Sequence, residues 1–218
     1  MSKQELSLTI ACMKIKYSFL LLAAFVFQPA FASYLSIGES GEILPASTQY
    51  QVGFAPQMVT NNDTGGNLST FLDSAWTDSL SSRFTLGLGV IDFFTGASLK
   101  YIPFPDVDKQ PAIGVKATFW YAREETENIS TIQIAPMMSK KFQSKDYGLF
   151  IPYTALGISS YEIGGKDKTG LQFFVGTEWK PVDLPEYNFT AEVAMDLDES
   201  VSSISLFVGL PFNEKSGF

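Results

Sequence analysis

The chain has 218 residues and a formal net charge of −8, with 45% hydrophobic and 17% charged residues. So acidic a chain lacks the basic face that nucleic-acid binding requires, and its apolar content is too high for a disordered protein. It contains no histidine and one cysteine, which excludes internal disulfides, Cys/His zinc sites and histidine general bases.

The first 32 residues have the pattern of a secretory signal peptide. Two lysines precede an uninterrupted apolar run over residues 19–27, which is far shorter than the ~20 residues that a membrane-spanning helix needs. Ala30 and Ala32 then form a small-x-small cleavage site. We therefore expect residues 1–32 to be removed on export. Cys12 would be lost with them, and thiol nucleophile chemistry is excluded from the mature chain.

The rest of the chain alternates apolar and polar residues, as β-strands do, without the 3.6-residue period of an amphipathic helix. Short stretches of turn residues separate the alternating segments. An eleventh candidate, residues 35–44, alternates less clearly. In chain order the ten clear segments are residues 48–58, 68–77, 83–90, 97–101, 113–121, 131–139, 149–153, 171–180, 187–196 and 203–212.

Two features indicate that the apolar phase of these segments faces lipid. Large aromatic residues of this phase lie near segment ends, as in the girdle of a membrane–water interface. The other phase consists mostly of Gly, Ser, Thr and Gln, which suits the narrow interior of a closed barrel. Residues 149–153 are the least clear, and there we assign Leu149, Ile151 and Tyr153 to the outward phase. In a ten-strand meander one rim would collect Tyr50, Trp76, Phe84, Tyr101, Trp179, Tyr187 and Phe212.

In this architecture, over residues 48–218, the chain resembles the small outer-membrane β-barrel proteins of Gram-negative bacteria. The resemblance implies a location in the cell outer membrane, contact with the lipid bilayer and lipopolysaccharide, and insertion by the outer-membrane assembly machinery. A polar stretch, residues 213–217, departs from the family pattern. The family's C-terminal assembly signal would be carried by Ile204, Leu206, Val208, Gly209, Leu210 and Phe212, with Phe218 as the last residue.

We predict an all-β fold: a closed antiparallel up-and-down transmembrane β-barrel of ten strands, with twelve or eight as the alternatives. The count should be even because both ends of such barrels face the periplasm. Residues 33–47 would form an N-terminal extension outside the wall or at its rim. In the twelve-strand alternative, residues 35–44 would be the first strand.

The expected function is a non-enzymatic outer-membrane barrel, either a narrow pore or a plugged structural barrel. The barrel enzymes that the resemblance suggests, such as lipid A deacylases and omptin proteases, depend on a histidine that this chain lacks. No cofactor or metal site is expected, and the oligomeric state is open. The alternative is a periplasmic barrel that binds an apolar ligand, supported by apolar residues on the polar phase: Phe150, Leu156, Ile158, Phe174 and Phe207.

Charged residues on the polar phase are expected in the lumen: Arg83, Lys100, Lys116, Glu178, Glu192 and Asp196. In a ring of ten strands the basic residues would lie opposite the acidic ones. Lys100 and Lys116 should face each other across a hairpin, and two adjacent buried lysines need a counter-charge. We predict that Glu192 is their closest partner.

Overall fold

The computed structural model describes residues 35–45, 48–61, 64–124 and 127–213. The expected signal peptide, Phe218 and most of the polar stretch before it lie outside the described residues. Within the described part of the chain, no helix is long and apolar enough to cross a membrane.

Eleven strands lie within these residues. They are β1 Tyr50–Val59, β2 Gly65–Thr77, β3 Leu80–Gly89, β4 Phe93–Phe104, β5 Ala112–Glu124, β6 Glu127–Ser139, β7 Phe142–Ser144, β8 Gly148–Ile163, β9 Lys166–Lys180, β10 Asn188–Asp198 and β11 Ser203–Phe212. β6 and β7 occupy one position in the wall, because both pair with β8. The wall built by the described strands therefore has ten positions.

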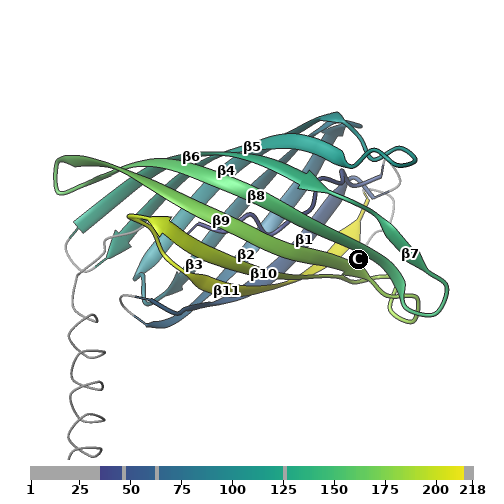
Figure 1. Cartoon of the computed structure of the whole chain (residues 1–218). Coiled ribbons are helices and arrows are strands. Elements are labelled where there is room, and N and C mark those ends of the chain that lie inside the picture. Colours follow the sequence, from purple (N-terminus) through teal and green to yellow (C-terminus); the bar gives the residue numbers. More distant parts are fainter. Residues whose placement is uncertain (1–34, 46–47, 62–63, 125–126, 214–218) are drawn as a thin grey trace, which may run out of the picture.

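The strands form a closed antiparallel barrel (Figure 1). Neighbours in the wall follow the chain order, and β1 pairs with β11 to close the ring. The predicted ten-strand barrel is confirmed, and the twelve- and eight-strand alternatives are wrong. We call the rim where Tyr50 pairs with Phe212 the proximal rim, and the rim where Val59 pairs with Ser203 the distal rim.

Side chains along the wall alternate between an exposed apolar outer face and a buried inner face. On the outer face Phe54, Leu99 and Ile132 are each about half exposed. On the inner face the neighbours of these residues are glycine, polar or charged, or large side chains that fill the lumen. A protein with an apolar core would show the reverse pattern, with its apolar side chains buried inside and its polar side chains exposed to water.

Inward-facing glycines make room for aromatic rings from the neighbouring strand. Direct cross-strand partners are Gly53 and Phe71, Gly87 and Phe94, Gly96 and Trp120, and Gly176 and Tyr153. A Cβ added at any of these glycines would lie only 2.1 to 2.4 Å from the nearest ring atom. The rings lie flat against the inner wall and occupy the space above the neighbouring strand. The narrow lumen has no room there for side chains from both cross-strand partners, so one of the two must be glycine.

The assignment of β8 by sequence is wrong in phase. Ile151 and Tyr153 point into the lumen and are buried, whereas Leu156 and Ile158 are exposed on the outer face. Both faces of this strand are apolar at this height, so alternation does not distinguish them. Of the apolar residues expected in the interior, Phe174 and Phe207 are buried there, but Phe150, Leu156 and Ile158 are not.

Residues 35–45 lie inside the barrel, and we call them the luminal segment. Leu35, Ile37 and Ser40 are buried, and the segment makes hydrogen bonds to inward-facing side chains of the wall. The segment is not a strand. The expected position outside the wall or at its rim is therefore wrong for the described part of residues 33–47. The cause is a set of buried wall charges that the segment neutralises.

Candidate functional site

The luminal segment crosses the barrel between two walls of opposite charge. Lys100 and Lys116 come from adjacent strands, β4 and β5, and are direct cross-strand partners, as expected. Glu178 on β9 and Glu192 on β10 come from the other side of the ring. All four side chains are buried, so each needs a partner within the lumen.

The partner of the lysine pair is Glu39 of the luminal segment. Its two carboxylate oxygens lie 2.6 Å from Lys100 Nζ and 2.7 Å from Lys116 Nζ. The two lysine side chains are only 4% and 2% exposed. The prediction that Glu192 would be their closest partner is wrong, because the luminal segment lies between the two walls. One carboxylate thus bridges two buried ammonium groups that would otherwise repel each other.

Glu192 instead binds the main chain of the luminal segment. Its carboxylate accepts hydrogen bonds from the backbone N–H of Ile37 at 3.0 Å and of Gly38 at 2.8 Å. Tyr153 donates its hydroxyl to the same carboxylate at 2.7 Å. Three donors around a buried carboxylate compensate for its loss of water. Glu192 therefore fixes the segment at the point where it passes the acidic wall.

Glu178 extends the acidic wall toward the proximal rim. It accepts a hydrogen bond from the hydroxyl of Ser40 at 2.7 Å and forms an ion pair with Lys180 at 3.1 Å. Ser139 Oγ accepts a hydrogen bond from the backbone N–H of Gly41 at 3.1 Å. The segment is thus bound at successive residues.

Arg83 closes the remaining space beside the segment. It makes a two-point ion pair with Asp73, at 2.6 and 2.8 Å, across the β2–β3 pair. Its third group, Nη1, donates to the carbonyl of Gly38 at 3.0 Å. The guanidinium also lies 4.3 Å from the ring centre of Phe71 and 5.7 Å from that of Phe207. Such fork-shaped and stacked contacts suit arginine and would not be reproduced by lysine.

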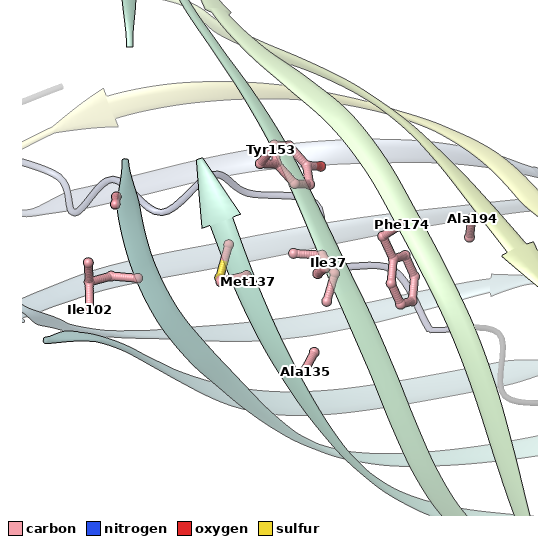
Figure 2. Packing of buried hydrophobic residues seen from close by; sticks show 9 residues of the cluster. Ile37, Ile102, Ala135, Met137, Tyr153, Phe174 and Ala194 are labelled. Atoms are coloured by element: carbon pink, nitrogen blue, oxygen red, sulfur yellow. The ribbon is translucent and has the colours of Figure 1, made fainter. Parts of the chain in front are cut away.

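Ile37 anchors the segment in a small apolar cluster. Figure 2 shows its side chain among those of Ala135, Met137, Tyr153 and Phe174, which come from β6, β8 and β9. The cluster also includes Ile102 from β4 and Ala194 from β10. A buried Ile side chain contributes about 1.5–3 kcal/mol to stability relative to an exposed one.

Two small cavities border the luminal segment among the described residues of the lumen. Both have a volume of about 30 Å³ and both border Arg83, Phe71 and Phe207. A cavity of this size holds one or two water molecules. The distal cavity also borders Ser36, and the proximal one borders Ile43. The luminal segment and the Arg83 stack therefore lie between these two cavities.

The structure brings together five of the six charged residues predicted for the lumen. Arg83, Lys100 and Lys116 contact the segment directly, as do Glu178 and Glu192. Asp196 lies apart from them near the distal rim, where it accepts hydrogen bonds from Asn61 and the backbone of Ser200. Within the described residues no group of three or more acidic, histidine or cysteine side chains is placed to hold a metal ion.

Six of the seven predicted girdle aromatics lie at or near the proximal rim, whereas Phe84 lies in the middle of β3, opposite Leu72 and Ala97. Trp76 is 66% exposed, and Phe84 and Tyr101 are each about half exposed on the outer face. Tyr50 and Phe212 stack with ring centres 5.6 Å apart across the closing strand pair. Trp179 stacks on Phe150 from the neighbouring strand at 5.9 Å, and Tyr187 lies 6.0 Å from Phe189.

Sequence reasoning did not identify the residues that complete this site. Glu39 and Ser40 lie in a segment with no motif. Asp73 lies in the alternating residues 68–77 but is not among the charges predicted for the lumen, and Tyr153 is predicted on the wrong face. Glu39 is the one carboxylate of the segment that reaches both lysines. The signal that could have located Glu39 was the lysine pair itself. Two adjacent buried lysines require a counter-charge close to both ammonium groups. The luminal segment supplies this charge, and the opposite wall does not.

Comparison with known proteins gives similarity only in solved structures. No protein-family model and no curated protein matches the sequence. The beta domain of the Bordetella autotransporter BrkA is 10% identical with a TM-score of 0.44, and the match covers 75% of this chain and 98% of that one. LpxR from Salmonella typhimurium is 12% identical with a TM-score of 0.42, covering 78% and 86%. A de novo designed transmembrane β-barrel is 11% identical with a TM-score of 0.39, covering 78% and 98%. Similarity this low assigns no activity to the chain.

Proposed function

We propose that the protein is a non-enzymatic integral β-barrel of the bacterial outer membrane whose lumen is closed by its own residues 35–45. The observation that carries the proposal is the Glu39 carboxylate, which binds both Lys100 and Lys116 inside the barrel. Of the two functions expected from the sequence, a narrow pore or a plugged barrel, this contact supports the plugged barrel.

The outer face of the wall supports the membrane part of the proposal. Exposed large apolar side chains occur on every long strand of the barrel, among them Met58, Leu88, Phe119 and Ile204. A soluble monomer rarely exposes a contiguous apolar patch larger than a few hundred Å². A band around the whole wall, with aromatics at one rim, is the surface that a transmembrane barrel presents to lipid. The bilayer, lipopolysaccharide and the assembly machinery would be its partners.

The lumen supports a structural rather than a catalytic role. The buried carboxylates of Asp73, Glu178 and Glu192 are each engaged by the segment or by a wall cation. Arg83, Lys100 and Lys116 are likewise engaged. The charges at the centre of the barrel thus hold a polypeptide in place, and the cavities beside it have room for water alone.

Membrane insertion is tested by the fluorescence of the rim tryptophans. We expect Trp76 and Trp179 to be quenched by lipids labelled near the headgroup more than by lipids labelled at the chain ends, because both lie at the proximal rim. The variant Trp120→Phe removes the tryptophan that points into the lumen and serves as the control. A protein that stays soluble and unquenched with vesicles, and whose gel mobility does not change on heating, would contradict the proposal.

A further inference from the structure

The lumen binds the segment mainly through its main chain. Carbonyl oxygens are bound by the basic wall: Ile37 O by Lys116 at 2.7 Å, Gly38 O by Arg83 at 3.0 Å, and Ser40 O by Lys100 at 2.9 Å. Lys100 also binds the carbonyl of Glu42 at 2.7 Å. Backbone N–H groups are bound by the acidic wall and by Ser139. These groups belong to any polypeptide, so the site recognises a peptide backbone rather than one particular chain.

Side-chain selectivity comes from three positions of the segment. A carboxylate is required at position 39, where Lys100 and Lys116 converge. Position 38 has φ +65°, and a Cβ there would lie 2.5 Å from the Phe207 ring and 2.8 Å from Arg83 Nη1. A Cβ at position 41 would lie 2.7 Å from Ser139 Oγ. Position 38 therefore accepts only glycine, and position 41 favours glycine because any side chain there would displace Ser139 Oγ.

An apolar residue completes the pattern. Ile37 is 1% exposed and fills the cluster that Figure 2 shows. The side chain of Ser40 is small and donates to Glu178. The luminal segment therefore matches the site as apolar–Gly–Glu–small–Gly, residues 37–41, in an open conformation that is neither helix nor strand.

We infer that the barrel lumen is a peptide-binding site that accepts, in trans, a peptide with the pattern apolar–Gly–Glu–small–Gly in place of residues 37–41. The inference rests on the proposed function, because it takes the luminal segment to be the intramolecular occupant of this site. In the intact protein the tethered segment has the advantage of high effective concentration. A peptide in trans binds when that segment is displaced.

The test measures peptide binding directly and does not depend on conductance. The probe is a fluorescent peptide with the sequence of residues 35–45, and its binding to the full-length barrel in detergent micelles is followed by anisotropy. The host is the double variant Gly38→Ala/Gly41→Ala, whose own segment no longer fits. We expect saturable binding to this host and little binding to the wild-type barrel, whose site is occupied. Heat-modifiable gel mobility verifies that each host is folded.

Matched peptides test the selectivity. Peptides carrying Gly38→Ala or Glu39→Gln should bind the double variant at least about tenfold more weakly. The alanine Cβ would clash with the Phe207 ring and with Arg83, and the glutamine lacks the charge that pairs with the two lysines. Adding both Lys100→Gln and Lys116→Gln to the host should remove the preference for Glu over Gln in the peptide, because both lysines contact the Glu39 carboxylate. If the double variant does not fold, the single variant Gly38→Ala in the full-length chain is the second host, because its segment is displaced by the clash at position 38 while its wall is unchanged.

The inference is overturned if no peptide binds a folded host, or if the Gly38→Ala peptide binds as tightly as the unmodified one. Failure of the proposed function has a different signature. If the proposed function is wrong, the barrel does not insert into membranes, or the wild-type lumen conducts freely. Either result is independent of whether the peptide binds.

Discussion

The carboxylate of Glu39 lies between the ammonium groups of Lys100 and Lys116, at 2.6 and 2.7 Å, in the interior of a ten-position barrel. The two lysines are cross-strand partners and are almost fully buried. The wall therefore carries two adjacent positive charges whose neutralising charge comes from outside the wall. This relationship ties the stability of the barrel to the position of the luminal segment.

Removing the carboxylate should destabilise the barrel strongly. Glu39→Gln leaves two buried lysines without a counter-charge, and breaking a buried pair in this way costs about 3–5 kcal/mol. The free energy of unfolding by urea, measured in lipid vesicles, should fall by that amount. Glu42→Gln is the matched control, because Glu42 pairs with Lys141, whose side chain is 42% exposed. Its effect should stay below about 1 kcal/mol. Equal effects of the two substitutions would contradict the assigned role of Glu39.

The luminal segment should stay in place in mild acid. Burial by itself would raise the pKa of Glu39, but the charges of Lys100, Lys116 and Arg83 outweigh it and hold the pKa below the ordinary value of 4.5. The stabilisation from a carboxylate with a lowered pKa is fully present above the unfolded-state value and is lost as the pH falls through the folded-state value.

We therefore expect the same closed conductance at pH 7 and at pH 4, where Glu39 is still ionised in the folded protein. The difference in unfolding free energy between the wild type and Glu39→Gln should be constant above pH 4.5 and shrink below it. A difference that already shrinks between pH 6 and pH 5 would show that Glu39 is not held ionised by the lysines.

Glycine under an aromatic ring should be essential at the inner wall. Gly176→Ala places a Cβ 2.4 Å from the Tyr153 ring, and such overpacking costs about 1–3 kcal/mol. Gly66→Ala is the control, because the nearest atom to its Cβ would be 3.8 Å away. Urea midpoints of the two variants compare them directly. A tolerated Gly176→Ala would show that the ring can move, and hence that Tyr153 is not fixed against Glu192.

The direction of the barrel in the membrane follows from the position of its ends. The proximal rim, where β1 begins and β11 ends, should face the periplasm. Lys109 lies in the β4–β5 turn at that rim, and Lys166 lies in the β8–β9 hairpin at the distal rim. In intact cells a membrane-impermeant maleimide should label Lys166→Cys and leave Lys109→Cys unlabelled. The reverse labelling would mean the opposite orientation.

The strands could be predicted from the sequence because each is amphipathic with a period of two. Segments such as residues 83–90 place apolar side chains outward and small or polar ones inward, and this local rule holds wherever one face meets lipid. It fails for β8, whose inner face buries Ile151 and packs Tyr153 and Ala155 into the apolar luminal cluster. The inner surface of that strand is apolar because the luminal segment covers it.

The luminal segment could not be predicted, because its position depends on contacts between residues far apart in the chain. Gly38 and Glu192 are 154 residues apart, and Glu39 and Lys116 are 77 apart. The segment has no regular secondary structure and hence no periodic signal. The inward direction of the charged wall residues could be predicted from the alternation of the strands. Their partners could be identified only once the strands and the luminal segment are placed together in the closed barrel.

The most direct test of the closed lumen is the conductance of Gly38→Ala in planar bilayers. An alanine at a position with φ +65°, pressed against Phe207 and Arg83, should displace the segment without altering the wall. We expect the wild type and the control Gly66→Ala to remain closed, and Gly38→Ala to show stepwise open currents. A folded Gly38→Ala barrel that stays as closed as the wild type, or a wild type that already conducts as Gly38→Ala does, would contradict the account.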